Sequence, residues 1–131
     1  MKYLLDTNIC IALLKNSDIT LIKKMKSHTP NQFAICSIVK AELLYGARKS
    51  QAVENNLLLL SKFFDQLESL PFDDKATDFY GTQRAILEKA GTPIGQADLL
   101  IASIALANNL TVITRNQKEF IRVQGLKVDV W

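Results

Sequence analysis

The stretch MKYLLDTNIC, residues 1–10, decides the fold class of this chain. Its apolar part predicts a short buried strand over residues 2–5, and a helical pattern begins soon after it. Asp6 stands at the junction, followed by Thr7 and Asn8. These residue types favour helix starts, so Asp6 is interpreted either as a helix cap or as part of a site. The choice depends on where the other unusually placed acids lie.

The composition predicts one globular domain over residues 1–131, with 48% hydrophobic and 22% charged residues. The net charge of +3 permits an anionic partner without requiring one. Cys10 and Cys36 lack the spacing of metal ligands, which is typical of a protein in the reducing cytoplasm. A single His28 argues against a zinc site. No apolar run approaches the roughly 20 residues of a membrane span, and no signal peptide is visible.

Strands and helices alternate along the rest of the chain. The further strands are expected at 33–36, 69–72, 110–114 and 126–131, and the helices at 8–15, 20–27, 37–49, 51–67, 73–91 and 97–109. Ser37 and Asp73 are the expected caps of the helices that they start. Short strands that are apolar throughout predict a mostly parallel sheet, and the intervening helices predict a three-layer α/β/α sandwich.

Ligands of such sheets bind outside the carboxyl ends of the strands. Asp6 lies at that end of the first strand, while Glu42 and Asp98 are acids with mainly apolar helical neighbours. Taken singly, each has a structural interpretation as a cap, a helix-dipole partner or an amphipathic boundary residue. The polar residues expected at the ends of the second and fourth strands are Ser37, Thr114, Arg115 and Asn116.

Carboxylates that converge at one edge of a sheet repel each other unless a cation lies among them. Ligand sets made only of oxygen select Mg²⁺ or Mn²⁺ over zinc. Metal ions held by acids hydrolyse phosphodiester bonds, and the sequence has no phosphate-binding glycine loop, serine-hydrolase motif or Cys/His pair that would compete. Phosphodiester hydrolysis is therefore the predicted chemistry.

The segments that carry these acids resemble the PIN-domain ribonucleases, specifically the VapC-type toxins of bacterial toxin–antitoxin pairs. They are LLDTNI (4–9), SIVKAELLYGA (37–47), GQADLLIASIALANNLTVITRNQKEF (95–120) and the closing GLKVDVW. The resemblance covers essentially the whole chain. It implies an Mg²⁺-dependent or Mn²⁺-dependent endoribonuclease with an α/β/α fold, which forms a homodimer and is inhibited by a cognate antitoxin.

The same resemblance assigns roles to residues. Asp6, Glu42 and Asp98 would form the catalytic acidic site, with Asp6 and Asp98 as the main metal ligands and Glu42 orienting the attacking water. The implied supporting residues are Thr7, Asn8, Ser37 and Thr114. Many PIN domains have a fourth acid after the fourth strand, where this chain has Asn116. Either Asn116 or Glu119 would complete the site, and a weaker second metal position would allow one-metal catalysis.

Substrate and partner follow by analogy. Several such enzymes cut tRNA, so a tRNA is the expected substrate, and Arg115 would hold the cleaved strand. The apolar face of residues 51–67 is wider than one core contact requires, so it is expected either in the core or against a second subunit or antitoxin.

Two other functions stay open from the residues alone. A haloacid-dehalogenase-like phosphatase also has an aspartate after the first strand, but its second Asp would stand at Asn8. A receiver-type signalling module needs paired acids there too, although FDD at 72–74 partly matches its phospho-acceptor.

Overall fold

The computed structural model describes residues 1–131 and contains five strands and seven α-helices. The strands are β1 (Tyr3–Leu5), β2 (Phe33–Cys36), β3 (Glu68–Leu70), β4 (Thr111–Thr114) and β5 (Lys127–Val130). The helices are α1 (Thr7–Lys15), α2 (Ile19–Lys26), α3 (Ser37–Arg48), α4 (Val53–Asp65), α5 (Asp74–Lys89), α6 (Gln96–Ala107) and α7 (Gln117–Phe120). A short 3-10 helix, Pro30–Gln32, precedes β2.

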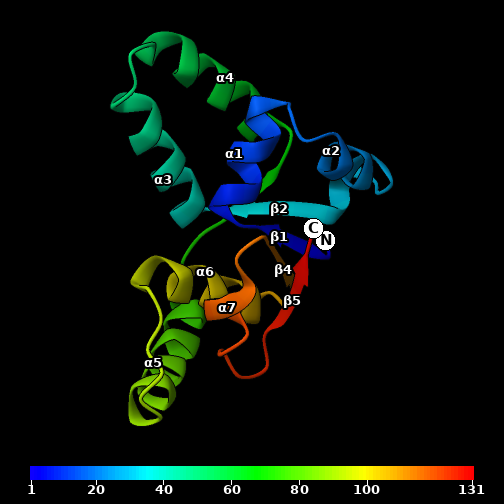
Figure 1. Cartoon of the computed structure of the whole chain (residues 1–131). Coiled ribbons are helices and arrows are strands. Elements are labelled where there is room, and N and C mark those ends of the chain that lie inside the picture. The colour runs from blue at the N-terminus through cyan, green and yellow to red at the C-terminus, as the bar shows by residue number, and fades with distance from the viewer.

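The five strands form one sheet in the order β3-β2-β1-β4-β5, and every neighbouring pair is parallel. Helices α1 to α4 lie on one side of the sheet and α5 to α7 on the other (Figure 1). The predicted three-layer α/β/α architecture is therefore confirmed. The short strands are buried on both faces, as Leu4, Leu5 and Ile35 show with no exposed surface.

The strand order places β1 between β2 and β4, so the chain changes direction across the sheet at β1. The helix after β1 lies on one face, and the helix after β4 lies on the other (Figure 1). A crevice opens at such a switch point, at the carboxyl ends of the two central strands. The fold thus brings the residue after β1, Asp6, near the residues that follow β4.

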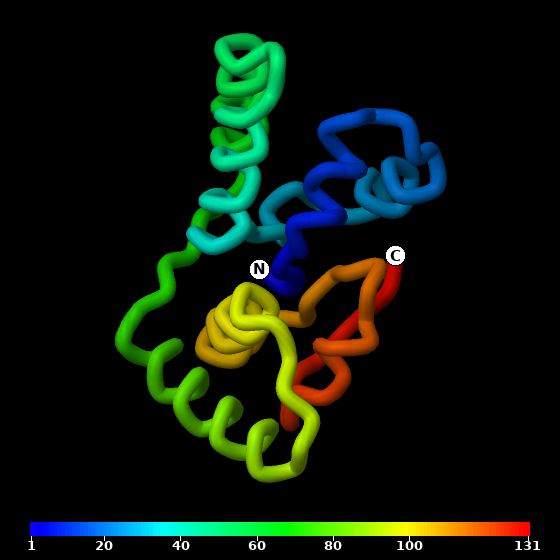
Figure 2. The backbone as a smooth tube through the Cα atoms, turned by 60° about the vertical axis from the view of Figure 1, so that its left-hand side comes forward, coloured from blue at the N-terminus to red at the C-terminus, as the bar shows by residue number.

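Helix α6 forms the centre of the helical layer made by α5 to α7 (Figure 1). Its side chains Ile101, Ala102 and Ile104 have no exposed surface. Helices α3 and α4 extend together away from the sheet (Figure 2). On α4 only Leu60 is buried, whereas Leu58 and Leu59 are about half exposed. The apolar face of α4 is therefore only partly used by the core.

An aromatic cluster joins the last residue to the first strand. The ring of Trp131 lies 5.1 Å from Tyr3 and 5.7 Å from Phe33, measured between centroids. His28 stacks on Trp131 at 5.1 Å, and the ammonium of Lys24 lies over the same indole. His28, which lies in a polar segment of the sequence, thus packs among aromatic rings.

Several details differ from the expected pattern. Ser37 is not a cap: Cys36 occupies that position without a side-chain hydrogen bond, and Ser37 is the first residue of α3. The third strand ends at Leu70, before Pro71, because proline cannot donate to the ladder. Helix α7 is an additional element. No helix combines the length and the apolar character that a membrane span requires.

Candidate active site

A small pocket of about 130 Å³ lies at the switch point of the sheet. Three acids contributed by three separate segments share it: Asp6 after β1, Glu42 on α3 and Asp98 on α6. No Lys or Arg lies on its wall. The remaining wall residues are Thr7, Asn8, Asn116 and Phe120. The fold therefore gathers the acids that stood out in the sequence into one negatively charged pocket.

Asp6 is both a helix cap and a member of this pocket. One carboxylate oxygen accepts a 2.7 Å hydrogen bond from the N–H of Thr7, and the other accepts one of 2.8 Å from Oγ1 of Thr114. Asp6 is 6% exposed, and burial raises its pKa despite these two hydrogen bonds. The helix-cap interpretation of Asp6 is thus confirmed, and the same carboxylate also lines the pocket.

Glu42 reaches the pocket from the surface of α3. Its Oε1 accepts a 2.7 Å hydrogen bond from Oγ1 of Thr7. Glu42 is exposed, so it does not lie on a buried apolar face. Thr7 therefore links the two acids: its backbone N–H donates to Asp6, and its hydroxyl donates to Glu42.

Asp98 lies in the first turn of α6, beside Glu119 of α7. Burial, then the hydrogen bond with Glu119 and the charges of Asp6, Glu119 and Glu42, raise the pKa of Asp98 to about 7. The same hydrogen bond lowers the pKa of Glu119, which also accepts the N–H of Gly95 at 3.4 Å. When Asp98 carries its proton, it thus donates a hydrogen bond to the Glu119 carboxylate.

The donor set fits a hard divalent cation in its chemistry. The possible metal ligands on its wall are all oxygen atoms: three carboxylates, the hydroxyl of Thr7 and the amide carbonyls of Asn8 and Asn116. Burial and mutual repulsion raise the pKa of Asp6 and Asp98, and a cation would relieve both effects. As they stand, no three or more Asp, Glu, His or Cys side chains are arranged as a ready set of metal ligands.

Thr114 and Asn116 support the pocket from the end of β4. The backbone N–H of Asn116 donates to Oγ1 of Thr114 at 3.0 Å, so the hydroxyl accepts one bond and gives one to Asp6. Asn116 lines the pocket, while Glu119 contacts Asp98. The two residues predicted as alternatives therefore take different positions at the same site.

Three other predicted residues have different neighbours from those expected. Ser37 lies outside the pocket and donates to the carbonyl of Leu70 at 3.4 Å. Asn8 lines the wall but makes no side-chain hydrogen bond with Asp6. Arg115 forms an ion pair with Asp18. Asp18 and the wall residue Phe120 were not predicted, because their role depends on packing between distant segments.

Comparison with known proteins identifies the family. The PIN domain family matches residues 3–126. "Ribonuclease VapC2" of Rickettsia felis is 45% identical over the whole chain and 98% of its own length. "tRNA(fMet)-specific endonuclease VapC" of Salmonella typhimurium is 39% identical with the same coverage.

Solved structures agree with this result. VapBC2 from Rickettsia felis bound to a promoter DNA fragment has a TM-score of 0.93 at 42% identity, covering 100% of this chain and 99% of that one. DNA-bound VapBC from Salmonella typhimurium has a TM-score of 0.94 at 39% identity, with 100% and 98% covered. The chain therefore belongs to the PIN domain family, among the VapC ribonucleases.

Proposed function

We propose that this chain is a single-domain, divalent-metal-dependent endoribonuclease and the toxin of a toxin–antitoxin pair. The observation that carries the proposal is the convergence of Asp6, Glu42 and Asp98 on one pocket without a cationic side chain. An RNA phosphodiester is an anion, so it approaches such a pocket only where a cation offsets the carboxylates.

Asp6 and Asp98 would hold Mg²⁺ or Mn²⁺, and Asn116 would offer a neutral oxygen to the same ion. The bound ion would lower the pKa of a water molecule and stabilise the leaving oxygen. Thr114 fixes Asp6, and Thr7 aims Glu42 at the pocket, where Glu42 orients the attacking water.

Glu119 is the fourth acid of the proposed catalytic group, and it acts through its hydrogen bond with Asp98. In the metal-free pocket its carboxylate accepts a hydrogen bond from protonated Asp98 and another, of 3.4 Å, from the backbone N–H of Gly95 at the start of α6. A bound cation would displace the proton of Asp98 into solvent, and Glu119 would then lie beside Asp98 as a second carboxylate. The two side chains thus act as a pair.

A tRNA is the proposed substrate. Support comes from relatives named tRNA(fMet)-specific endonuclease in Salmonella typhimurium and Shigella flexneri, which are 39% and 37% identical over the whole chain. Arg115, directly before Asn116, is the nearest arginine in the sequence to a pocket residue and would hold the cleaved strand.

The proposed partners are a cognate antitoxin and a second copy of the chain. Similar structures are VapBC complexes, and one, from Rickettsia felis, holds a promoter DNA fragment. Leu58 and Leu59 on α4 expose about half of their surface and would be covered by one of these partners. The unpaired, buried Cys10 and Cys36 are consistent with the cytoplasm as the place of action.

The test compares wild-type protein with Asp6→Asn and Asp98→Asn on total RNA, in Mg²⁺, in Mn²⁺ and in EDTA. Cleavage is expected only from the wild type and only with a divalent ion. Asp78→Asn is the matched control, because Asp78 is an exposed acid on α5 outside the pocket. Cleavage by both pocket variants at the wild-type rate, or cleavage in EDTA, would overturn the proposal.

A further inference from the structure

A second cavity lies next to the acidic pocket and shares Asn8 of α1 with it. This groove lies between α1, the start of α2 and the residue after β4, and its volume is about 620 Å³. Sites for small organic ligands typically measure about 300–1,000 Å³, so the space is adequate for one nucleotide. The residues that matter below are Asn8, Ile11, Lys15, Asp18, Ile19 and Arg115, all on its wall.

The groove and the acidic pocket are neighbours on the protein surface. Asn8 lines both of them. Arg115 lines the groove, and its neighbour Asn116 lines the pocket. An RNA strand bound at the pocket would therefore have the groove beside it, with Asn8 at the boundary between the two cavities.

The charges of the two cavities are opposite. The pocket wall has acids and no base, whereas the groove has Arg115 and Lys15 against the single acid Asp18. Lys15 has no ion-pair partner, because the structure contains only the pairs Arg115–Asp18 and Arg84–Glu88. An extended polyanion with one phosphate at the pocket would gain attraction for its next phosphate in the groove.

Asp18 fixes the position of Arg115. Its Oδ1 caps α2 by accepting the N–H of Leu21 at 3.0 Å, and its Oδ2 accepts the guanidinium of Arg115. A guanidinium carries five N–H donors, so donors remain for a phosphate beside the one that binds Asp18. The cap of α2 thus holds an arginine at the mouth of the groove.

The groove also offers apolar surface of the kind that a nucleobase covers. Ile19 is 68% exposed and Ile11 is 37% exposed, although both are large hydrophobic residues. Bases combine an apolar face with polar edges, and Asn8 supplies a side-chain amide at the same wall.

We propose that this groove binds the RNA nucleotide next to the cleaved phosphodiester bond. Arg115 and Lys15 contact its phosphate, Ile11 and Ile19 contact its base, and Asp18 positions Arg115. The proposal rests on the nuclease function proposed above. It makes Lys15 and Arg115 determinants of RNA affinity that take no part in the chemical step.

The test measures binding of total tRNA to full-length protein in EDTA, where cleavage is not expected. Arg115→Ala and Lys15→Ala should each raise Kd about tenfold. Each should also reduce the slope of log Kd against log salt concentration by about 1, the value for one lost phosphate contact. Arg115→Lys should give an intermediate Kd because it keeps the charge and loses the fork of donors. In Mg²⁺, KM should rise more than kcat falls.

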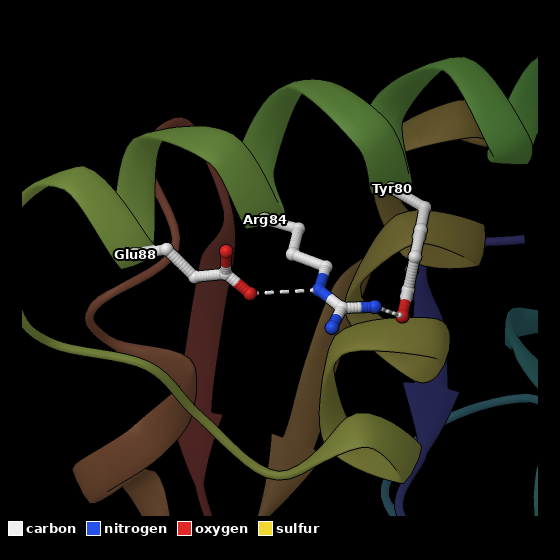
Figure 3. Close-up of polar contacts among 3 residues, drawn as sticks. All are labelled: Tyr80, Arg84 and Glu88. Carbon is white, nitrogen blue, oxygen red and sulfur yellow. Dashed lines mark hydrogen bonds and ion pairs between the residues drawn. The ribbon is translucent and has the colours of Figure 1, made fainter.

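The structure offers a matched control. Arg84 is also an exposed arginine in an ion pair: it donates to Glu88 at 2.9 Å and to the hydroxyl of Tyr80 at 3.1 Å, on the surface of α5 (Figure 3). Arg84→Ala and Lys89→Ala should bind tRNA like the wild type. Thermal unfolding of each variant separates lost binding from lost folding.

The groove assignment is overturned if Arg115→Ala and Lys15→Ala bind tRNA as Arg84→Ala does. It is also overturned if these variants lose affinity for the antitoxin alone, because the groove would then be a protein site. A failure of the nuclease proposal is distinguished by the cleavage assay, in which Asp6→Asn and Asp98→Asn would retain activity. That result does not depend on how the groove variants bind tRNA.

Discussion

Thr114 and Asp6 are 108 residues apart in the sequence, yet the hydroxyl of Thr114 donates a 2.8 Å hydrogen bond to Oδ2 of Asp6. Both residues are buried, and the hydroxyl also accepts the N–H of Asn116. This bond ties the ends of β1 and β4 together at the acidic pocket. It lowers the pKa of Asp6 against the effect of burial.

Thr114→Val should therefore weaken both the fold and the site. Valine keeps the shape but leaves the Asp6 oxygen and the Asn116 N–H without this partner, which costs about 1–3 kcal/mol of unfolding free energy. Metal affinity should fall about 10-fold to 100-fold, as for other partners of ligating side chains. Chemical denaturation and Mn²⁺ titration measure the two effects. Ser103→Ala, which removes a buried hydroxyl bonded to Leu99, should change stability only.

Thr7→Val should reduce catalysis with little effect on folding. The change removes the 2.7 Å hydrogen bond to Glu42 and keeps the hydrogen bond that the backbone N–H of residue 7 donates to the helix cap Asp6. Glu42 is exposed, so it then rotates freely, and kcat on RNA should fall by about tenfold or more. Thr77→Val is the control, since Thr77 makes its hydrogen bond to a backbone carbonyl on α5. Equal kcat in both variants would contradict the role given to Thr7.

Asp98 should make the metal-free protein less stable as pH rises. Its pKa of about 7 in the fold exceeds its ordinary value of 3.8, so between these values the folded state holds a proton that the unfolded state has released. The free energy of unfolding therefore falls as pH rises through this window and has lost the full contribution above about pH 7.

Asp98→Asn removes this effect and keeps an N–H donor for Glu119. In EDTA at pH 8 it should raise the free energy of unfolding by about 1–2 kcal/mol, allowing for solvent screening, and at pH 4 it should give little or no gain. Denaturation curves at the two pH values measure this. Asp78→Asn should show no such pH dependence, and an equal gain from it would contradict the explanation.

Trp131→Ala should destabilise the fold by about 2 kcal/mol, because it removes the indole from its contacts with Tyr3, His28 and Phe33. Trp131→Phe should keep most of that stability. The midpoint of thermal unfolding checks both variants. An unchanged midpoint for Trp131→Ala would show that the cluster contributes nothing.

The sheet and the positions of the acids were predictable because each has a recognisable local sequence pattern. Short apolar runs identify β1, β2 and β4, and Asp6 and Asp98 stand next to apolar segments in which a charge is costly. The convergence of these acids followed from the carboxyl-end rule for parallel sheets.

What was not predicted depends on contacts between distant segments. Ser37 has the composition of a cap, but β2 runs directly into α3 and Cys36 takes the cap position. The ion pair of Asp18 with Arg115 joins the start of α2 to the end of β4, 97 residues further on. No local pattern reports such a pair, because its two members become neighbours only when the sheet is complete.

The order of the sheet also bears on when this protein can act during its synthesis. Strand β1 leaves the ribosome first, but it lies between β2 and β4, and β4 is made near the end of the chain. Until then β1 has one free edge, Asp6 lacks Thr114, and neither Asn116 nor Glu119 exists. We therefore expect a nascent chain to have no nuclease activity until β4 has been made, and we expect a product that stops before β4 to be inactive.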